Sequence, residues 1–387
     1  MMQDVSPRND TSALDDLRVL DFSRVLAGPF ATMVLADLGA TVTKVERPGG
    51  GDETRAWGPP YDAHGEATYF QSVNRNKDSV VLDLHDLADL RRGRELAASA
   101  DVIVENFRPG VMERLGLGYE ALAAERPGLI YCSITGFGGG AGADLPGYDL
   151  LVQAVGGLMS ITGSPEGEPQ KVGVALVDVL AGLFASVGIL TALRHRERTG
   201  EGQRVEVDLL SALLAGLVNQ GAAYTIAGAV PRRLGNAHPS IAPYELFETG
   251  HGQLVLAVGN DRQFAALGEV LGAPELAGDP RFATNRDRVS HRDALRAQLE
   301  ARLATRSAAD WAEALTEVRV PAGVVNDLAG AFALAQSLGL EPVASVPGPD
   351  GEVVRLTRNP IRLSRTPPTY RSAPPRLPGT GKDAADG

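Results

Sequence analysis

Short apolar runs alternate with longer amphipathic segments through the first third of the chain. The runs typical of buried strands cover residues 17–22, 41–46, 79–84, 101–106 and 129–135. Helical patterns lie between them, most clearly over 28–38 and 87–99. This alternation predicts an α/β fold with a Rossmann-like parallel sheet and helices on both faces.

A longer uncharged run covers residues 179–193 and directly follows Asp178. Burying an unpaired carboxylate is costly, so Asp178 needs either a structural partner or a chemical task. Asp is a favoured helix N-cap, and capping by itself would explain the position. The run is shorter than the roughly 20 apolar residues that cross a bilayer, so we expect no membrane span.

Beyond residue 200 the patterns predict a second, smaller α/β domain. Residues 205–226 read as a long helix and connector, and 254–258 read as a strand. An Ala- and Leu-rich helical region then extends to about residue 318. The 387 residues exceed the size at which one core usually stops growing, which also favours two domains.

Composition excludes several classes of protein. Hydrophobic residues make up 44% and charged residues 22%, as in ordinary soluble proteins. With 37 basic and 48 acidic residues the net charge is −11, which argues against a nucleic-acid partner. Cys132 is the single cysteine, so we expect no disulfide and no cysteine-based metal site. Residues 1–16 lack the apolar core of a signal peptide, and we expect a cytoplasmic protein.

Arginines recur where a parallel sheet binds ligands, after the carboxyl ends of its strands. These are Arg24, Arg47, Arg75, Arg108 and Arg114. Any one of them is most simply a solvated surface residue. Together, near helix N-termini, they predict a site for phosphates. The chain has no Gly-rich dinucleotide fingerprint and no P-loop, which argues against NAD and ATP.

Several ordered motifs resemble family III CoA-transferases, whose close relatives include the α-methylacyl-CoA racemases. The resemblance covers roughly residues 17–208. Its motifs are Val25-Leu26-Ala27-Gly28-Pro29, Asn74-Arg75-Asn76-Lys77, Val104-Glu105-Asn106-Phe107-Arg108-Pro109-Gly110, Gly147-Tyr148-Asp149 and Val205-Glu206-Val207-Asp208.

The resemblance implies roles for individual residues. Asp178 corresponds to the catalytic aspartate, and Tyr148 to a residue beside the thioester. His238 lies in a segment that looks like the loop closing over the intermediate; it is either a substrate-side residue or a structural one. Asp261 lies near an acidic position of the racemases, although a turn or cap role is favoured. The implied CoA-binding residues are Val25, Leu26, Ala27, Arg47, Arg75, Leu82, His85, Asn106, Phe107, Arg108 and Arg114.

The reaction that the resemblance implies moves CoA between two carboxylic acids. An aspartyl anhydride and an aspartyl-CoA thioester at Asp178 would be the intermediates, with acyl-CoA as substrate and neither a metal nor a tightly bound cofactor. Racemases of this group carry His at the position of Tyr148; Tyr, with an ordinary pKa of about 10, is a poorer proton shuttle. The alternatives are an α-methylacyl-CoA racemase and a non-catalytic CoA-binding protein, the latter disfavoured by the intact Asp178. The residues do not distinguish dicarboxylate, hydroxy-acid and aromatic substrates.

The resemblance also implies an organisation of the chain. We expect a large CoA-binding domain over 17–225 and 330–371, a small domain with connectors over 226–329, and an interlocked homodimer. Residues 1–16 are polar, and 372–387 are rich in Pro, Gly and small polar residues. Both ends are therefore expected to be mobile tails.

Overall fold

The computed structural model describes residues 12–348 and 351–377, which form two compact units. Unit 1 contains residues 12–158, 172–228 and 341–377 with that gap, and unit 2 contains 159–171 and 229–340. Three segments thus differ from the expected boundaries: 159–171 and 330–340 belong to the smaller unit, and 226–228 belong to the larger one.

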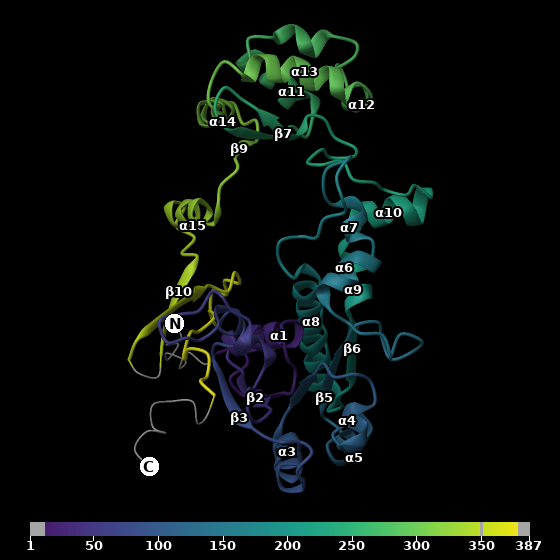
Figure 1. Cartoon of the computed structure of the whole chain (residues 1–387), viewed down its shortest axis with the longest axis vertical. Coiled ribbons are helices and arrows are strands. Elements are labelled where there is room, and N and C mark those ends of the chain that lie inside the picture. The colour runs from purple at the N-terminus through teal and green to yellow at the C-terminus, as the bar shows by residue number, and fades with distance from the viewer. Residues whose placement is uncertain (1–11, 349–350, 378–387) are drawn as a thin grey trace, which may run out of the picture. The chain divides into compact units, whose positions relative to one another are not determined.

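Unit 1 is built on a six-stranded parallel sheet with the order β3-β2-β1-β4-β5-β6 (Figure 1). Its strands are β1 (Arg18–Asp21), β2 (Thr41–Glu46), β3 (Lys77–Val81), β4 (Val102–Glu105), β5 (Ile130–Thr135) and β6 (Arg204–Asp208). The five predicted strands and the α/β class are confirmed. The helix predicted from residue 205 is wrong at its start, because Val205 and Val207 alternate with polar residues and pair with β5.

Helices cover both faces of this sheet. On one face, Leu20, Ile103 and Tyr131 pack with Ala97 of α3 (Leu87–Ser99) and Leu122 of α5 (Tyr119–Glu125). Elsewhere α1 (Ala27–Asp37) packs against β2 and α8 (Leu176–Thr199), which also contacts β5 and β6. The remaining helices of unit 1 are α2 (Thr68–Gln71), α4 (Val111–Arg114), α6 (Asp149–Val155), α9 (Leu209–Gly216), α10 (Val218–Ala227) and the 3-10 turn η1 (Glu53–Ala56).

Helix α8 has 24 residues, so the argument that its apolar run is too short to cross a bilayer is wrong. By length and composition α8 could span a membrane, and the bent pair α9–α10 passes the same test together. Such helices also occur in the cores of soluble proteins. Ala181, Ala185 and Ile189 of α8 are fully buried, in keeping with a helix that packs on α1 and the sheet.

Unit 2 has its own core around a three-stranded antiparallel sheet, with the order β7-β8-β9. The strands are β7 (Tyr244–Glu248), β8 (Gln253–Ala257) and β9 (Ala322–Val324). The helices are α7 (Leu158–Ile161), which begins at the last residue of unit 1, α11 (Asp261–Val270), η2 (Pro274–Gly278), α12 (Asn285–Ser290), α13 (Arg292–Leu303), α14 (Ala308–Glu317) and α15 (Leu328–Ser337). Phe247, Phe264 and Trp311 are among the buried residues of this core.

The chain returns to unit 1 through the hairpin β10 (Val343–Pro347) and β11 (Val353–Thr357). Residues 372–377, expected in a mobile tail, instead pack on unit 1. The amide of Asn76 donates to the carbonyl of Ser372 (3.0 Å), and the Arg55 guanidinium donates to the carbonyl of Pro375 (2.9 Å). At the other end, the amide of Leu14 donates to the carbonyl of Leu38 (3.1 Å). Residues 1–11 and 378–387 lie outside the described residues.

Candidate active site

A pocket in unit 1, here called the Asp178 pocket, opens at the carboxyl ends of β1, β4 and β5. It takes residues from the turn after β1, the segment after β4, the loop after β5 and the start of α8. Its walls include Arg24, Val25, Leu26, Ala27, Glu53, Asn106, Arg108, Gly136, Gly147, Tyr148, Asp149 and Asp178. Seven of the residues predicted from sequence line this pocket: Val25, Leu26, Ala27, Asn106, Arg108, Tyr148 and Asp178.

Asp178 lies in the first turn of α8 but does not cap it. The helix begins at Leu176, and its N-cap Ala175 makes no side-chain hydrogen bond. The cap comes instead from Asp149 at the start of α6, whose Oδ1 accepts from the amides of Val177 (2.8 Å) and Asp178 (3.3 Å). The capping role first considered for Asp178 belongs to Asp149, which leaves the Asp178 carboxylate free to face the pocket.

Asp149 and Gln153 lie one helical turn apart on α6. Together they hold residues 172–178, the segment by which the chain re-enters unit 1. Asp149 Oδ2 accepts from Gln153 Nε2 (2.6 Å), and Gln153 Oε1 accepts from the amide of Val172 (2.9 Å). Gln153 is 1% exposed, so this amide is held in one position. The two side chains fix the segment that leads from residue 172 to Asp178.

The electrostatic setting of Asp178 is unusual for a carboxylate. Burial, together with the nearby negative charge of Asp149, raises its pKa from 3.8 to about 7. Burial disfavours the charged form, and a like charge disfavours it further. Asp178 is therefore partly protonated at neutral pH, in contrast to the ordinary ionised carboxylate assumed from residue type.

Two glycines hold the loop that carries Tyr148. Gly136, just after β5, and Gly147 approach so closely that a Cβ on either would collide with the backbone of the other. Only glycine leaves room for such an approach. This contact fixes the position at which α6 begins, while the Tyr148 side chain itself is 63% exposed. Tyr148 thus lines the pocket from its open side.

The turn from Arg24 to Ala27 is held in a strained shape beside Asp178. Val25 has φ of 69°, a left-handed conformation that β-branched residues rarely adopt. Asn106 clamps the turn from one side: its Oδ1 accepts from the Arg24 amide (2.8 Å) and its Nδ2 donates to the Arg24 carbonyl (2.7 Å). Asp52 holds it from the other, accepting from the Val25 amide at 3.3 Å. Strain of this kind is typical of functional sites.

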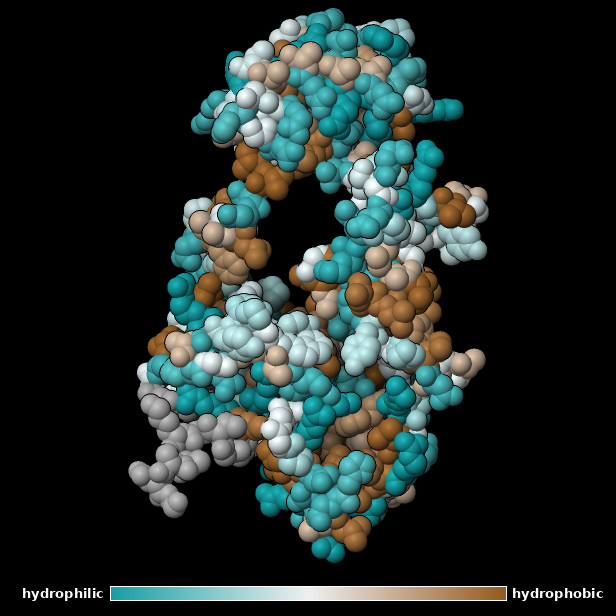
Figure 2. Space-filling view, viewed as in Figure 1, coloured by the Kyte–Doolittle hydropathy of each residue, from teal (hydrophilic) through white to brown (hydrophobic). Residues whose placement is uncertain are grey.

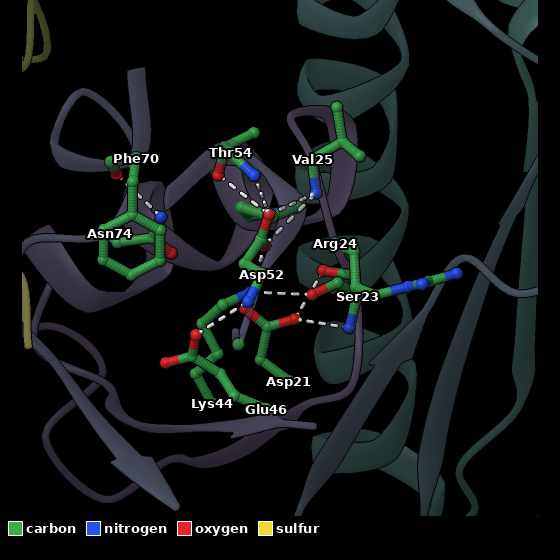
Figure 3. Close-up of polar contacts among 12 residues, drawn as sticks. Asp21, Ser23, Arg24, Val25, Lys44, Glu46, Asp52, Thr54, Phe70 and Asn74 are labelled. Carbon is green, nitrogen blue, oxygen red and sulfur yellow. Dashed lines mark hydrogen bonds and ion pairs between the residues drawn. The ribbon is translucent and has the colours of Figure 1, made fainter. Parts of the chain in front are cut away.

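Beneath the turn lies a buried ion cluster formed by Asp21, Lys44, Asp52 and Lys77 (Figure 3 shows the first three). Lys44 Nζ donates to the carbonyl of Ser23 (2.8 Å) and pairs with Asp52 (2.9 Å). Lys77 Nζ pairs with Asp21 (3.1 Å). Although burial alone would raise it, Lys44 holds the pKa of Asp52 below its ordinary value. The cluster supports the pocket from below, and its side chains are not among the residues that line the Asp178 pocket.

Helix α1 begins directly at the pocket. Its N-cap Leu26 has no side-chain cap, and Ala27 is both the first helical residue and a wall of the pocket. A Cβ on Gly182 of α8 would meet the carbonyl oxygen of Ala27 at 2.6 Å, so the glycine allows the two helices to touch. This contact brings the N-terminal amides of α1, the positive end of the helix, close to the turn that carries Asp178.

A second pocket, here called the Arg47 pocket, adjoins the first and shares Arg24 with it. It lies after β2 and β3, with Lys44, Arg47 and His85 as its basic residues and with Leu82 and Phe107 among its apolar ones. Arg47 is largely exposed, and its Nε donates to the Gly51 carbonyl (3.1 Å). An exposed guanidinium beside an apolar wall suits a nucleotide whose phosphates face solvent.

Two predicted site residues of unit 1, Arg75 and Arg114, lie outside both pockets, and a third, His238, belongs to unit 2. Arg75 is buried and forms a bidentate pair with Asp37 (2.9 and 2.6 Å), so its prediction as a phosphate ligand is wrong. Arg114 is exposed at the end of α4 and lines neither pocket. His238 belongs to unit 2, where its Nδ1 accepts from the Ser240 amide (3.1 Å) and its ring packs on Tyr244; its two predicted roles stay predictions.

Other candidates also have structural explanations. Asp261 starts α11 and pairs with the buried Arg288 (2.7 Å). Cys132 is fully buried in β5, and burial raises the pKa of its thiol. No group of His, Cys, Asp and Glu residues suited to a metal ion occurs among the described residues.

Sequence reasoning assigned no site role to Asp149, Arg24 and Glu53, which all line the Asp178 pocket. Arg24 was noted as a cation but not chosen, and Glu53 lies in a loop that the strand pattern does not mark. In the structure Arg24 Nη1 pairs with Glu53 Oε1 (2.6 Å), and the guanidinium lies 5.0 Å from the centre of the Phe107 ring. A signal was available in the Gly51-Asp52-Glu53 turn, which follows the predicted strand at 41–46 and so lies at the ligand-binding edge.

Comparisons with known proteins agree with this architecture. The model of CoA-transferase family III matches residues 14–383. The succinate–glutarate CoA-transferase of Agrobacterium fabrum is 45% identical over 377 residues, covering 95% of this chain and 94% of its own. The acetyl-CoA:oxalate CoA-transferase of Acetobacter aceti is 42% identical, covering 98% and 97%.

A solved structure gives the same result for the fold. The crystal structure of a CaiB/BaiF family protein from Brucella suis superposes with a TM-score of 0.84 at 43% identity, covering 95% of this chain and 97% of that one. The match extends over nearly the whole length of both proteins, so it concerns the complete chain and not one shared domain. The chain belongs to CoA-transferase family III and is a CoA-transferase.

Proposed function

We propose that the protein exchanges CoA between two carboxylic acids by covalent catalysis at Asp178. One observation carries this proposal: a half-buried carboxylate with a raised pKa lines a pocket at the ligand-binding edge of the sheet, and its pKa is shifted by burial and by Asp149, with no cation beside it among the described residues. A carboxylate in that setting is poorly stabilised as an anion, which favours its reaction with an electrophile.

The exchange can be written as balanced steps. The Asp178 carboxylate attacks the thioester carbonyl of the donor, the C–S bond breaks, and a mixed anhydride forms with release of CoA thiolate. The thiolate attacks the aspartyl carbonyl, freeing the donor acid and leaving an aspartyl-CoA thioester. The acceptor carboxylate then repeats both steps in reverse. The protein supplies orientation and excludes water, because either intermediate would otherwise hydrolyse.

The pair Asp149–Asp178 helps the first step. Acylation removes the negative charge of Asp178. The acyl-enzyme therefore lacks the electrostatic repulsion between Asp178 and Asp149 that destabilises the free enzyme. The same effect makes the Asp178 carboxylate more basic, and hence a better nucleophile, than one at its ordinary pKa. The N-terminal amide of Ala27, at the positive end of α1, is suited to stabilise the oxyanion that forms beside Asp178.

The names of the similar proteins favour dicarboxylic acids as substrates. The Agrobacterium and Acetobacter proteins are named for succinate with glutarate and for oxalate. The Asp178 pocket contains Arg108, an exposed cation that a second carboxylate can reach. We therefore propose that at least one of the two acids carries a carboxylate beyond the reacting one.

Racemisation at the α-carbon is the second candidate activity, and Tyr148 argues against it. The Tyr148 phenol lies at the position where racemases carry His and is a poor proton shuttle near pH 7. Incubation of the parent with an acyl-CoA in deuterated water, without an acceptor acid, tests this. Incorporation of deuterium at the α-carbon would support the racemase.

The covalent mechanism is tested by trapping. The protein is incubated with succinyl-CoA, quenched with hydroxylamine and digested, and the peptide containing Asp178 is analysed by mass spectrometry. We expect a hydroxamate on Asp178 in the parent and none in Asp178→Asn. Transfer by Asp178→Asn at the parental rate would overturn the mechanism.

We also propose that the active protein is a homodimer. Figure 2 shows hydrophobic residues gathered on unit 1 where Figure 1 places α6 and α9, and Leu150, Val155 and Leu214 are each more than half exposed. Monomeric proteins rarely expose large contiguous apolar patches. Light scattering after size exclusion should give twice the mass of one chain. The double variant Leu150→Glu/Leu214→Glu should lower the measured mass towards that of a single chain.

A further inference from the structure

Glu105 is the last residue of β4 and lines neither the Asp178 pocket nor the Arg47 pocket. Its side chain is 7% exposed, and its Oε2 accepts from the amide of Phe107 (2.9 Å). This hydrogen bond joins the two residues on either side of Asn106. The backbone at Asn106, where the chain leaves the sheet, is therefore restrained by a buried carboxylate.

Asn106 and Phe107 both hold Arg24. The Asn106 side chain accepts from the Arg24 amide (2.8 Å) and donates to the Arg24 carbonyl (2.7 Å). The centre of the Phe107 ring lies 5.0 Å from the Arg24 guanidinium. Arg24 precedes Val25, whose φ is 69°, and strained backbone of this kind persists only where its surroundings hold it. A contact that fixes Asn106 therefore also helps to fix the strained turn at the wall of the Asp178 pocket.

The stability of the fold does not explain a carboxylate at this position. Burial raises the pKa of Glu105 to about 6, the charge of Glu113 adds to this, and hydrogen bonds together with Arg204 only partly oppose it. A carboxyl group whose pKa is raised by folding destabilises the folded chain once it is ionised, as Glu105 is at neutral pH. An ionised acceptor, however, makes the stronger hydrogen bond to the Phe107 amide.

We propose that Glu105 is a positioning residue of the active site. Its hydrogen bond to the Phe107 amide holds Asn106 in place, and Asn106 in turn holds the turn from Arg24 to Ala27 in the shape that binds acyl-CoA. Glu105 acts through these residues and does not touch the substrate. This inference rests on the proposed function for the identity of the ligand, and it extends the site inward to the end of β4.

The test is a double-mutant cycle between Glu105 and Asn106, with the Kd of CoA measured by calorimetry. Glu105→Leu removes the acceptor and should raise the Kd about 10-fold, the effect of one lost hydrogen bond to a charged group. Glu105→Gln keeps an acceptor oxygen and should recover most of this loss. In the Asn106→Ala background, Glu105→Leu should add less than about 2-fold, because the contact through which it acts is gone. Glu113→Gln, at an exposed residue of α4, is the matched control and should leave the Kd unchanged.

A purely structural role for Glu105 gives different results. The urea midpoint of each variant is measured beside its Kd, and Glu105→Leu should change the midpoint little, because the lost hydrogen bond is offset by the removal of a buried charge. A Kd that rises by the same factor with and without the Asn106 side chain would overturn the proposal. It would also be overturned if Glu105→Leu binds CoA like the parent, or if Glu105→Gln binds as weakly as Glu105→Leu.

Two further points keep the result decisive. If Glu105→Leu does not fold, Glu105→Met takes its place in the cycle, because its flexible side chain fills a similar space without a carboxylate oxygen. Binding needs no turnover, so a parent that binds CoA but transfers none from succinyl-CoA would refute the proposed function. The Kd values would still decide the role of Glu105.

Discussion

Two aspartates of unit 1, Asp52 and Asp178, differ in the charge that faces each of them. Asp52 lies against Lys44, and its pKa is held below the ordinary value although burial opposes this. Asp178 lies near Asp149, and burial and that like charge raise its pKa to about 7. Desolvation acts on both in the same direction, so the neighbouring charge decides the difference. The first carboxylate is structural, and the second is suited to reaction.

The largest expected effect comes from removing the Asp178 carboxylate. Asp178→Asn keeps the shape of the side chain and loses the nucleophile, so transfer from succinyl-CoA should fall by about 10³-fold or more. The exposed Asp144, in the loop before Tyr148, gives the matched control Asp144→Asn, which should stay within about 2-fold of the parent. Equal losses in both variants would contradict the assignment.

Removing the cation from the structural pair should unfold the protein more easily. Lys44→Met leaves Asp52 buried without its partner, and the free energy of unfolding should fall by roughly 3–5 kcal/mol in urea titrations. Adding Asp52→Asn removes the stranded charge and should recover part of the loss. The exposed pair Arg194–Glu197 is the control, because Arg194→Met should cost less than about 1 kcal/mol. A cost for Lys44→Met no larger than this would show that the cluster is not needed for stability.

The raised pKa of Asp178 predicts a stability difference that depends on pH. The folded chain keeps this proton up to about pH 7, whereas the unfolded chain releases it near 3.8, so the parent loses stability as pH rises between these values. Asp178→Asn carries no such charge. Its free energy of unfolding relative to the parent, measured in urea titrations, should therefore increase from pH 5 to pH 8, by less than the ceiling of roughly 4 kcal/mol for a shift of this size. A constant difference would mean that Asp178 titrates normally.

The smallest expected effect shows how much of the raised pKa of Asp178 comes from burial and how much comes from the charge of Asp149. Asp149→Asn keeps an acceptor for the amides of Val177 and Asp178 but removes the negative charge. The acidic limb of the kcat/KM profile, expected near pH 7 in the parent, should move to lower pH by up to about 1 unit, because burial remains. The Asp144→Asn control should not move it. An unchanged limb in Asp149→Asn would assign the whole shift to burial.

The sequence predicted the fold better than the contacts of the site residues. Alternating apolar runs predicted five of the six parallel strands, because buried parallel strands are marked by their own residues. The sixth, Arg204–Asp208, was read as helix since a short alternating segment gives a weak local signal. Arg75 was predicted to bind a phosphate, yet in the structure Arg75 and Asn76 bind Asp37, and Lys77 binds Asp21.

Within the site, the sequence by itself determined which chemical groups are present: a carboxylate at Asp178, a phenol at Tyr148, and cations after the strands. Only the tertiary structure decided what each does, because a charge acquires its role from neighbours that lie far away in the chain. Asp149, 29 residues from Asp178, caps the helix and raises the pKa of the nucleophile. Asp37, 38 residues from Arg75, removes that arginine from the pocket. Glu53, 29 residues from Arg24, pairs with it at the wall of the pocket. Such pairings depend on distance and burial, which no local pattern records.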